Sequence, residues 1–143
     1  MIFEETKSLK RLPQTILTEE NLKVYLTHET ERLNLEHAYW LKDVFLDKIG
    51  RMAPNLREIS LRRLRITNRA FTELVTHLKR LEIVDLSDCM HIGESGIKLM
   101  LVNNQKTLKE LQLSNIPQAL TDIICDHLSE TQNLRFLDIS FAK

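Results

Sequence analysis

The chain has few of the residues that interrupt regular structure: three glycines and three prolines in 143 residues. This scarcity excludes collagen-like and low-complexity sequence. Two cysteines are too few for a disulfide framework, which favours a reduced, intracellular compartment. Charge of one sign does not dominate either, because 20 Lys and Arg residues balance 20 Asp and Glu residues. No net field therefore draws the protein to nucleic acid or to an anionic membrane.

Long apolar runs are also missing. No run exceeds four residues, as in Leu99–Val102, whereas a membrane-crossing helix needs about 20. The amino-terminal residues Met1–Glu5 end in two acids, where a signal or transit peptide carries basic residues. These features predict an intracellular, cytoplasmic protein without a membrane partner, and they disfavour a mitochondrial location.

One spacing of apolar residues, Leu-x-x-apolar-x-apolar, recurs along the chain and indicates an internal repeat. Four copies begin at Leu56, Leu81, Leu108 and Leu134, and an earlier copy has Thr30 in place of the first leucine. The last apolar residue of each copy falls at position 35, 61, 86, 113 or 139, in steps of 26, 25, 27 and 26. So constant a step predicts one short strand in every unit.

A second apolar pattern follows each predicted strand, with spacings of five and three residues that place its members on one face of a helix. These sets are Leu41, Leu46 and Ile49; Ile66, Phe71 and Leu74; Ile92, Ile97 and Met100; and Leu120, Cys125 and Leu128. Thr67 and Thr121 stand where an N-cap is needed. Each unit is therefore predicted to contain a strand, a tight loop and a helix.

A unit of this kind buries its apolar face only by stacking on its neighbours, which predicts an α/β solenoid with concave parallel strands and convex helices. Residues 30–143 would hold four full units and a fifth strand. Residues 1–29 would form a degenerate capping half-repeat, with a helix over Leu17–Leu26 and Thr18 as its N-cap.

The segment Leu86–Ile97, with Cys89 three residues after the strand leucine, resembles the cysteine-containing leucine-rich repeat, whose unit is also about 26 residues long. Ile66-Thr67-Asn68 and Leu120-Thr121-Asp122 match a further portion of that motif. The resemblance implies a horseshoe-shaped protein-interaction module, as in the F-box/leucine-rich-repeat subunits of ubiquitin ligases and in ciliary or mitochondrial assemblies. Leu12-Pro13 is similar to the opening of an F-box, but too few residues follow it for that module, so no F-box is predicted.

Two Cys-x-His pairs, Cys89 with His91 and Cys125 with His127, have a spacing that zinc sites use. Both cysteines align with apolar positions of the other repeats, so we expect both to be buried and metal-free. No phosphate-binding loop, nucleophile elbow or pair of catalytic carboxylates is present. We therefore expect no enzymatic activity and no cofactor.

Arginines crowd the second repeat, but the charges of neighbouring repeats alternate in sign when the strands are aligned. The predicted columns are Glu31, Arg57, Glu82 and Lys109; Arg32 and Glu58; Glu36 and Arg62; and Arg63 beside Asp88. Such pairing argues against a phosphate-binding patch, and no nucleic-acid partner is predicted. Trp40, the single tryptophan, has two open interpretations: packing against the capping helix, or anchoring a partner.

The concave face of the last repeats and the carboxyl-terminal edge form the predicted partner surface, because charge compensation is weakest there. Its residues are Ile83, Asp85, Ser87, Glu110, Gln112, Ser114, Phe136, Asp138, Ile139 and Phe141. No helix follows the last strand in this sequence, so we expect another chain, or residues beyond Lys143, to cover that end. The predicted function is a structural or adaptor subunit of a larger assembly of ciliary or mitochondrial type. The alternative is the substrate-recognition part of an F-box-type ubiquitin ligase.

Overall fold

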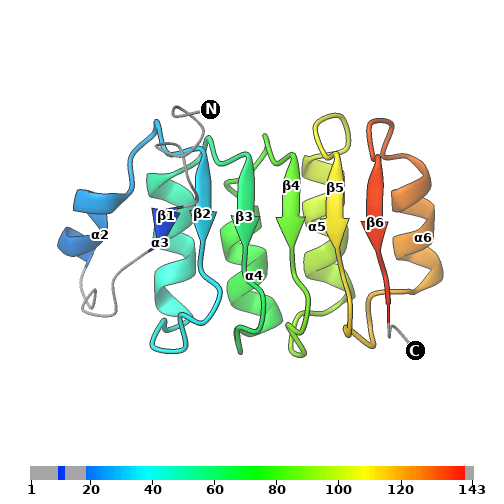
Figure 1. The fold of residues 1–143 in the computed structure, drawn as a ribbon, viewed down its shortest axis with the longest axis horizontal. Coiled ribbons are helices and arrows are strands. Elements are labelled where there is room, and N and C mark those ends of the chain that lie inside the picture. Colours follow the sequence, from blue (N-terminus) through cyan, green and yellow to red (C-terminus); the bar gives the residue numbers. More distant parts are fainter. Residues whose placement is uncertain (1–9, 12–18, 141–143) are drawn as a thin grey trace.

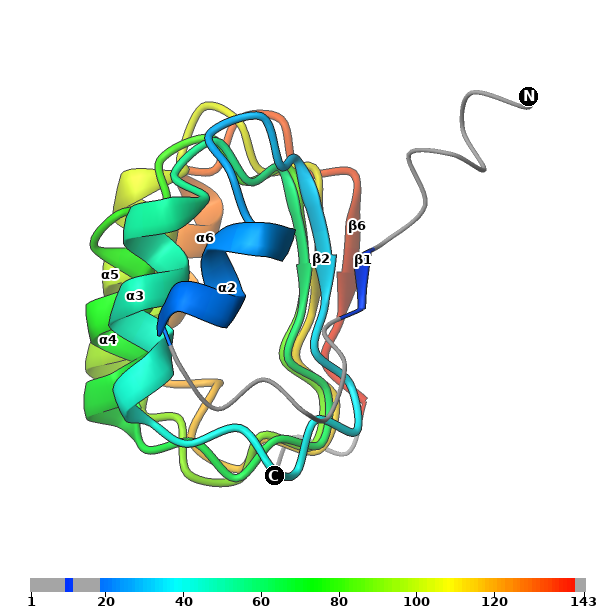
Figure 2. The same ribbon diagram turned by 90° about the vertical axis from the view of Figure 1, so that its left-hand side faces the viewer.

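The computed structural model describes residues 10–11 and 19–140 and has two layers, one parallel sheet and one row of helices (Figures 1 and 2). The strands follow one another in chain order across the sheet: β1 (Lys10–Arg11), β2 (Arg32–Asn34), β3 (Glu58–Ser60), β4 (Ile83–Asp85), β5 (Glu110–Gln112) and β6 (Phe136–Asp138). The helices are α2 (Glu19–Tyr25), α3 (Val44–Met52), α4 (Asn68–Val75), α5 (Glu94–Asn103) and α6 (Asp122–Ser129).

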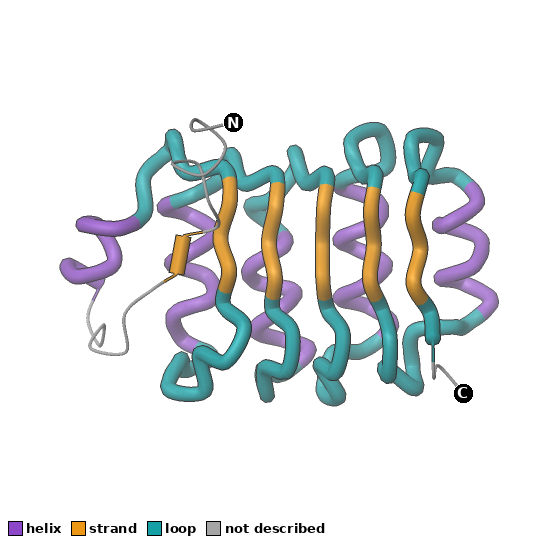
Figure 3. The backbone as a smooth tube through the Cα atoms, viewed as in Figure 1, coloured by secondary structure: helices purple, strands orange, loops and turns teal. Residues whose placement is uncertain are grey.

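The register of the strands reproduces the repeat in the sequence. Leu33 pairs with Ile59, Ile59 with Val84, Val84 with Leu111 and Leu111 with Leu137, all in parallel ladders (Figure 3). In β2 to β5 the middle residue is buried against the helices, and the residues on either side are only half-buried. The predicted α/β architecture of stacked strand–helix units is confirmed at this level.

Helix starts also agree with the sequence. The Thr67 hydroxyl accepts a hydrogen bond from the Ala70 amide, and the Thr121 hydroxyl accepts one from the Ile124 amide, both over 3.2 Å. Each cap satisfies one of the amides that the first turn of a helix leaves without a partner.

Close contacts bind each helix to the next one. A Cβ added at Gly96 of α5 would lie 2.7 Å from Cδ1 of Phe71 in α4, so this approach requires a glycine. Between α3 and α4, Nε2 of His77 lies 2.8 Å from a carboxylate oxygen of Asp47. The hydrogen bond from His77 lowers the pKa of Asp47 below its ordinary value.

Asn104, at the carboxyl end of α5, is a buried polar residue within the apolar core. Its side-chain Nδ2 donates to the carbonyls of Leu78 (3.0 Å) and Met100 (2.8 Å). Its Oδ1 accepts a hydrogen bond from the Leu81 amide over 2.8 Å. One side chain therefore fixes the turn before β4 onto the end of the following helix, and it satisfies backbone groups that have no access to water.

The amino-terminal region differs in one respect from the sequence prediction. The pairing of β1 with β2 was not predicted, and the capping segment therefore contributes a strand as well as helix α2. The proposed N-cap Thr18 lies outside the described residues. Trp40 is partly buried and packs against the hydrophobic core. Among the described residues, no helix is both long and apolar enough to cross a membrane.

Candidate protein-interaction surface

The helices cover one face of the sheet (Figure 2). The other face, which we call the open face, carries half-buried and exposed side chains. On β4 to β6 the strand register aligns these side chains in two rows. Ile83, Glu110 and Phe136 form the first row, and Asp85, Gln112 and Asp138 form the second. A row of two apolar side chains and one carboxylate thus lies next to a row with two carboxylates on the same face of the sheet.

The two aspartates of the second row have a structural role that does not need their charge. A carboxylate oxygen of Asp85 accepts from the Ser87 amide, and one of Asp138 accepts from the Ser140 amide, each over 2.9 Å. Asn34, the equivalent residue of β2, makes the same bond with a neutral amide oxygen. The hydrogen bonds from Ser140 lower the pKa of Asp138, so its carboxylate stays ionised well below neutral pH.

A serine follows each residue of the second row two positions later, and the three serines differ in solvent exposure. Ser87 is buried, and the hydroxyl of Ser114 lies 2.9 Å from that of Ser87. Ser87 therefore supports its neighbour and offers no surface to a partner, whereas Ser114 remains half-buried and Ser140 is exposed.

Apolar side chains are exposed where the sheet ends at β6. Phe136 is 50% exposed, and Leu137 and Ile139 are each 37% exposed. The residues at the positions of Leu137 and Ile139 in the preceding repeat, Leu111 and Leu113, are completely buried. The difference arises because a further strand and helix cover β5, and none of the described residues covers the outer side of β6. Phe141, which the sequence placed in the same surface, lies outside the described residues.

Helix α6 contributes to the same uncovered layer. Ile123 is exposed, and so is Cys125, which corrects the expectation that both cysteines are buried. Cys125 occupies the position that Ile97 has in α5, but Ile97 is covered by the next layer and Cys125 is not. Cys89 is buried as expected, and its thiol donates to the Leu61 carbonyl over 2.9 Å. Among the described residues, no three His, Cys, Asp or Glu side chains converge on one point.

Charges on the first repeats are compensated as the sequence predicted. The pairs are Arg32–Glu58 at 2.7 Å, Arg57–Glu31 at 3.8 Å, Arg62–Glu36 at 3.9 Å, Arg63–Asp88 at 3.7 Å and Lys109–Glu82 at 2.9 Å. By contrast, Asp85, Glu110 and Asp138 form no ion pair with a described Lys or Arg. Ion pairs therefore neutralise much of the open face over β2 and β3, and Asp85, Glu110 and Asp138 take no part in these pairs.

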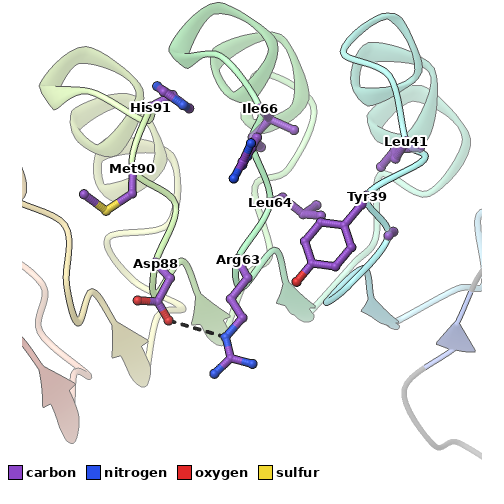
Figure 4. Close-up of a pocket in the computed structure, with 10 residues that line it drawn as sticks. Tyr39, Leu41, Arg63, Leu64, Ile66, Asp88, Met90 and His91 are labelled. Atoms are coloured by element: carbon purple, nitrogen blue, oxygen red, sulfur yellow. Dashed lines mark ion pairs between the residues drawn. The ribbon is translucent and has the colours of Figure 1, made fainter.

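A second candidate surface, which sequence reasoning missed, lies at the loops that follow β2, β3 and β4. A hollow of about 770 Å³ opens between them and is bordered by residues of three successive repeats (Figure 4). In Figure 4, Tyr39 stands on one side and Met90 and His91 stand on the other, with Leu64 and Ile66 between them.

The three loops have a common backbone path, which aligns their side chains. His37, Arg63 and Asp88 each adopt a left-handed conformation, with φ between 62° and 66°. One residue further on, Ala38, Leu64 and Cys89 point into the core, and the next residues, Tyr39, Arg65 and Met90, are all exposed. This equivalence of Tyr39, Arg65 and Met90 is visible in the repeat alignment and was the available signal for the hollow.

No family model matches the sequence, and a search of curated proteins found no match.

Proposed function

We propose that the chain is a leucine-rich-repeat module that joins a larger protein assembly through the open face of β4 to β6 and through the β6–α6 end, which no described residue covers. The observation that carries this proposal is the exposure of Phe136, Leu137 and Ile139 in one layer. Exposed apolar side chains on both faces of an end strand are a mark of protein contact sites, because such surface is unfavourable in water.

The open edge of β6 supports the same proposal. A parallel strand with an uncovered edge presents backbone amides and carbonyls that another chain can pair with. The backbone of β6 pairs with β5 on one side only, as in the bond from the Leu113 amide to the Asp138 carbonyl. A partner that covers Ile139 therefore gains main-chain hydrogen bonds together with apolar burial.

The chemistry of the open face indicates which partner surface fits. Ile83 and Phe136 supply apolar contact, and Asp85, Glu110 and Asp138 supply carboxylates that form no ion pair with a described Lys or Arg. The complementary surface is apolar with Lys or Arg at its rim, because such a rim pairs with the carboxylates and speeds association.

Substitutions that preserve the fold test this proposal. Phe136→Glu removes the exposed apolar side chain, and Asp85→Asn with Asp138→Asn removes two charges while an amide oxygen still accepts the turn hydrogen bonds, as Asn34 does. Val44→Glu is the matched control, because Val44 is 61% exposed on α3, in the opposite layer.

The measurement is affinity capture of the full chain from its native cells, with quantitative mass spectrometry of every variant. We expect at least one protein to be captured by wild type and Val44→Glu and to be lost with Phe136→Glu. Identical capture by all variants would contradict the proposal. Wild type should also associate with itself at high concentration in light scattering, and Phe136→Glu should do so less.

The alternative function, substrate recognition in an F-box-type ubiquitin ligase, is supported by one observation. Cys89 is buried in the loop after β4, where the cysteine-containing repeat class has its cysteine. Capture of a cullin together with its adaptor, at stoichiometric amounts, would favour this function over a structural subunit.

A further inference from the structure

The hollow between the three loops has an apolar floor. Leu64 and Ile66 are nearly fully buried, and their remaining exposed atoms face this space together with Leu41. Tyr39 and Met90, which are 63% and 46% exposed, form opposite walls (Figure 4). A volume of about 770 Å³ is within the range of sites that hold a ligand, and these walls suit an apolar side chain.

The charges around this floor are positive in balance. Asp88 is the carboxylate of the lining, and it is already engaged: Arg63 lies 3.7 Å away, Arg62 lies 3.9 Å away, and Asn115 donates to it over 2.8 Å. Arg65 forms no ion pair with any described acid.

The position of Arg65 in the repeat explains why it forms no ion pair with a described acid. The equivalent residues on either side of Arg65 are Tyr39 and Met90, and neither has a carboxylate that could pair with the guanidinium. Several other arginines pair with an acid of the neighbouring repeat, as Arg32 does with Glu58. The hollow therefore combines an apolar floor with one cation that forms no ion pair within the described part of the chain.

We infer that this hollow binds an acidic segment of a partner protein, with one apolar side chain between Tyr39 and Met90 and a neighbouring Asp or Glu paired with Arg65. This inference rests on the proposed function and adds a second contact to it. Three repeats span about 10 Å at the strand spacing, which is the length of three extended residues. Nucleic acid is disfavoured as the ligand, because Arg63 already forms an ion pair with Asp88. Too few cations then remain to follow a phosphate backbone.

Peptide arrays provide the test. Each peptide has a central Leu, Phe or Met with flanks of Asp and Glu, of Asn and Gln, or of Lys and Arg, and the full chain is the labelled analyte. We expect binding to the acidic peptides only, and binding that weakens when the central residue becomes Ser. The best acidic peptide is then titrated against variants by fluorescence polarisation.

Arg65→Gln is expected to weaken this peptide about tenfold, because a charge-assisted hydrogen bond is lost. The matched control is Arg69→Gln, since Arg69 lies in the same repeat, pairs with Glu73 at 3.1 Å and is outside the hollow. In a methyl NMR spectrum of labelled methionines, the peptide should shift the signal of Met90 and leave that of the buried Met100 unchanged.

The inference is overturned if acidic and neutral peptides bind alike, if no acidic peptide binds, or if both arginine variants weaken binding equally. These outcomes are separate from a failure of the proposed function. Phe136→Glu should bind the acidic peptide as wild type does, because Phe136 lies on β6 and the hollow lies after β2 to β4. Loss of peptide binding in that variant would also contradict the inference.

Discussion

Asn104 provides the sharpest test of how the layers are joined. Replacing it with alanine removes the donor to the Leu78 carbonyl and the acceptor of the Leu81 amide, and no other hydrogen bond to these two groups is found in the described structure. The Met100 carbonyl keeps a bond from the Asn104 amide. Two buried backbone groups thus lose their partner, at about 1–3 kcal/mol each.

We therefore expect Asn104→Ala to lower the free energy of unfolding by about 2–6 kcal/mol, a large share of the about 5–15 kcal/mol typical of a whole domain. Urea unfolding followed by circular dichroism measures this difference. The control is Asn133→Ala, because Asn133 donates to the Lys106 carbonyl over 2.6 Å at an exposed site where water replaces it. An Asn104→Ala loss no larger than that of the control would refute the reasoning, since it would mean that the turn relaxes or that water enters.

Three further predictions concern the core and the thiols. Leu111→Ala should cost about 2–5 kcal/mol in urea unfolding, because Leu111 is completely buried in β5; an unchanged midpoint would mean that the register is wrong. Burial raises the pKa of the Cys89 thiol to about 12, so an excess of maleimide at neutral pH should label Cys125 alone, and Cys89 only after denaturation. Two rapid labels in the native protein would contradict this. Gly96→Ala should lower the melting temperature, since its Cβ would clash with Phe71, and an unchanged melt would show that α4 and α5 separate easily.

The strands could be predicted because each unit repeats the same three apolar positions, and the register of Ile59, Val84 and Leu111 follows from that spacing. The strand at Lys10–Arg11 has no apolar signature, since its pairing with β2 is made by backbone groups that any residue carries. The exposure of Cys125 was missed for a different reason. Alignment gives the position of a side chain within a unit, whereas burial depends on whether a further unit packs over it.

The same distinction, between what one unit determines and what depends on its neighbours, applies to the candidate sites. The row of Ile83, Glu110 and Phe136 on the open face follows from strand periodicity, because the three residues pair in register. The hollow was not predicted, because it is formed between loops of separate units rather than by a motif within one unit. The importance of Arg65 is visible only when it is compared with the equivalent residues of the adjoining repeats, which border the same hollow.

The layered contacts also bear on how the molecule opens. Every close contact between described helices or strands joins elements of adjacent layers, such as α4 with α5 and β5 with β6. A layer with neighbours on both sides must break two interfaces to unfold, whereas β6 and α6 need to break one. Amide hydrogen exchange should therefore be faster in β6 and α6 than in β5 and α5, which have neighbours on both sides. A partner bound over Ile139 would supply the second interface and slow that exchange. The exchange rates of the β6 and α6 amides would therefore report both partner binding and local stability.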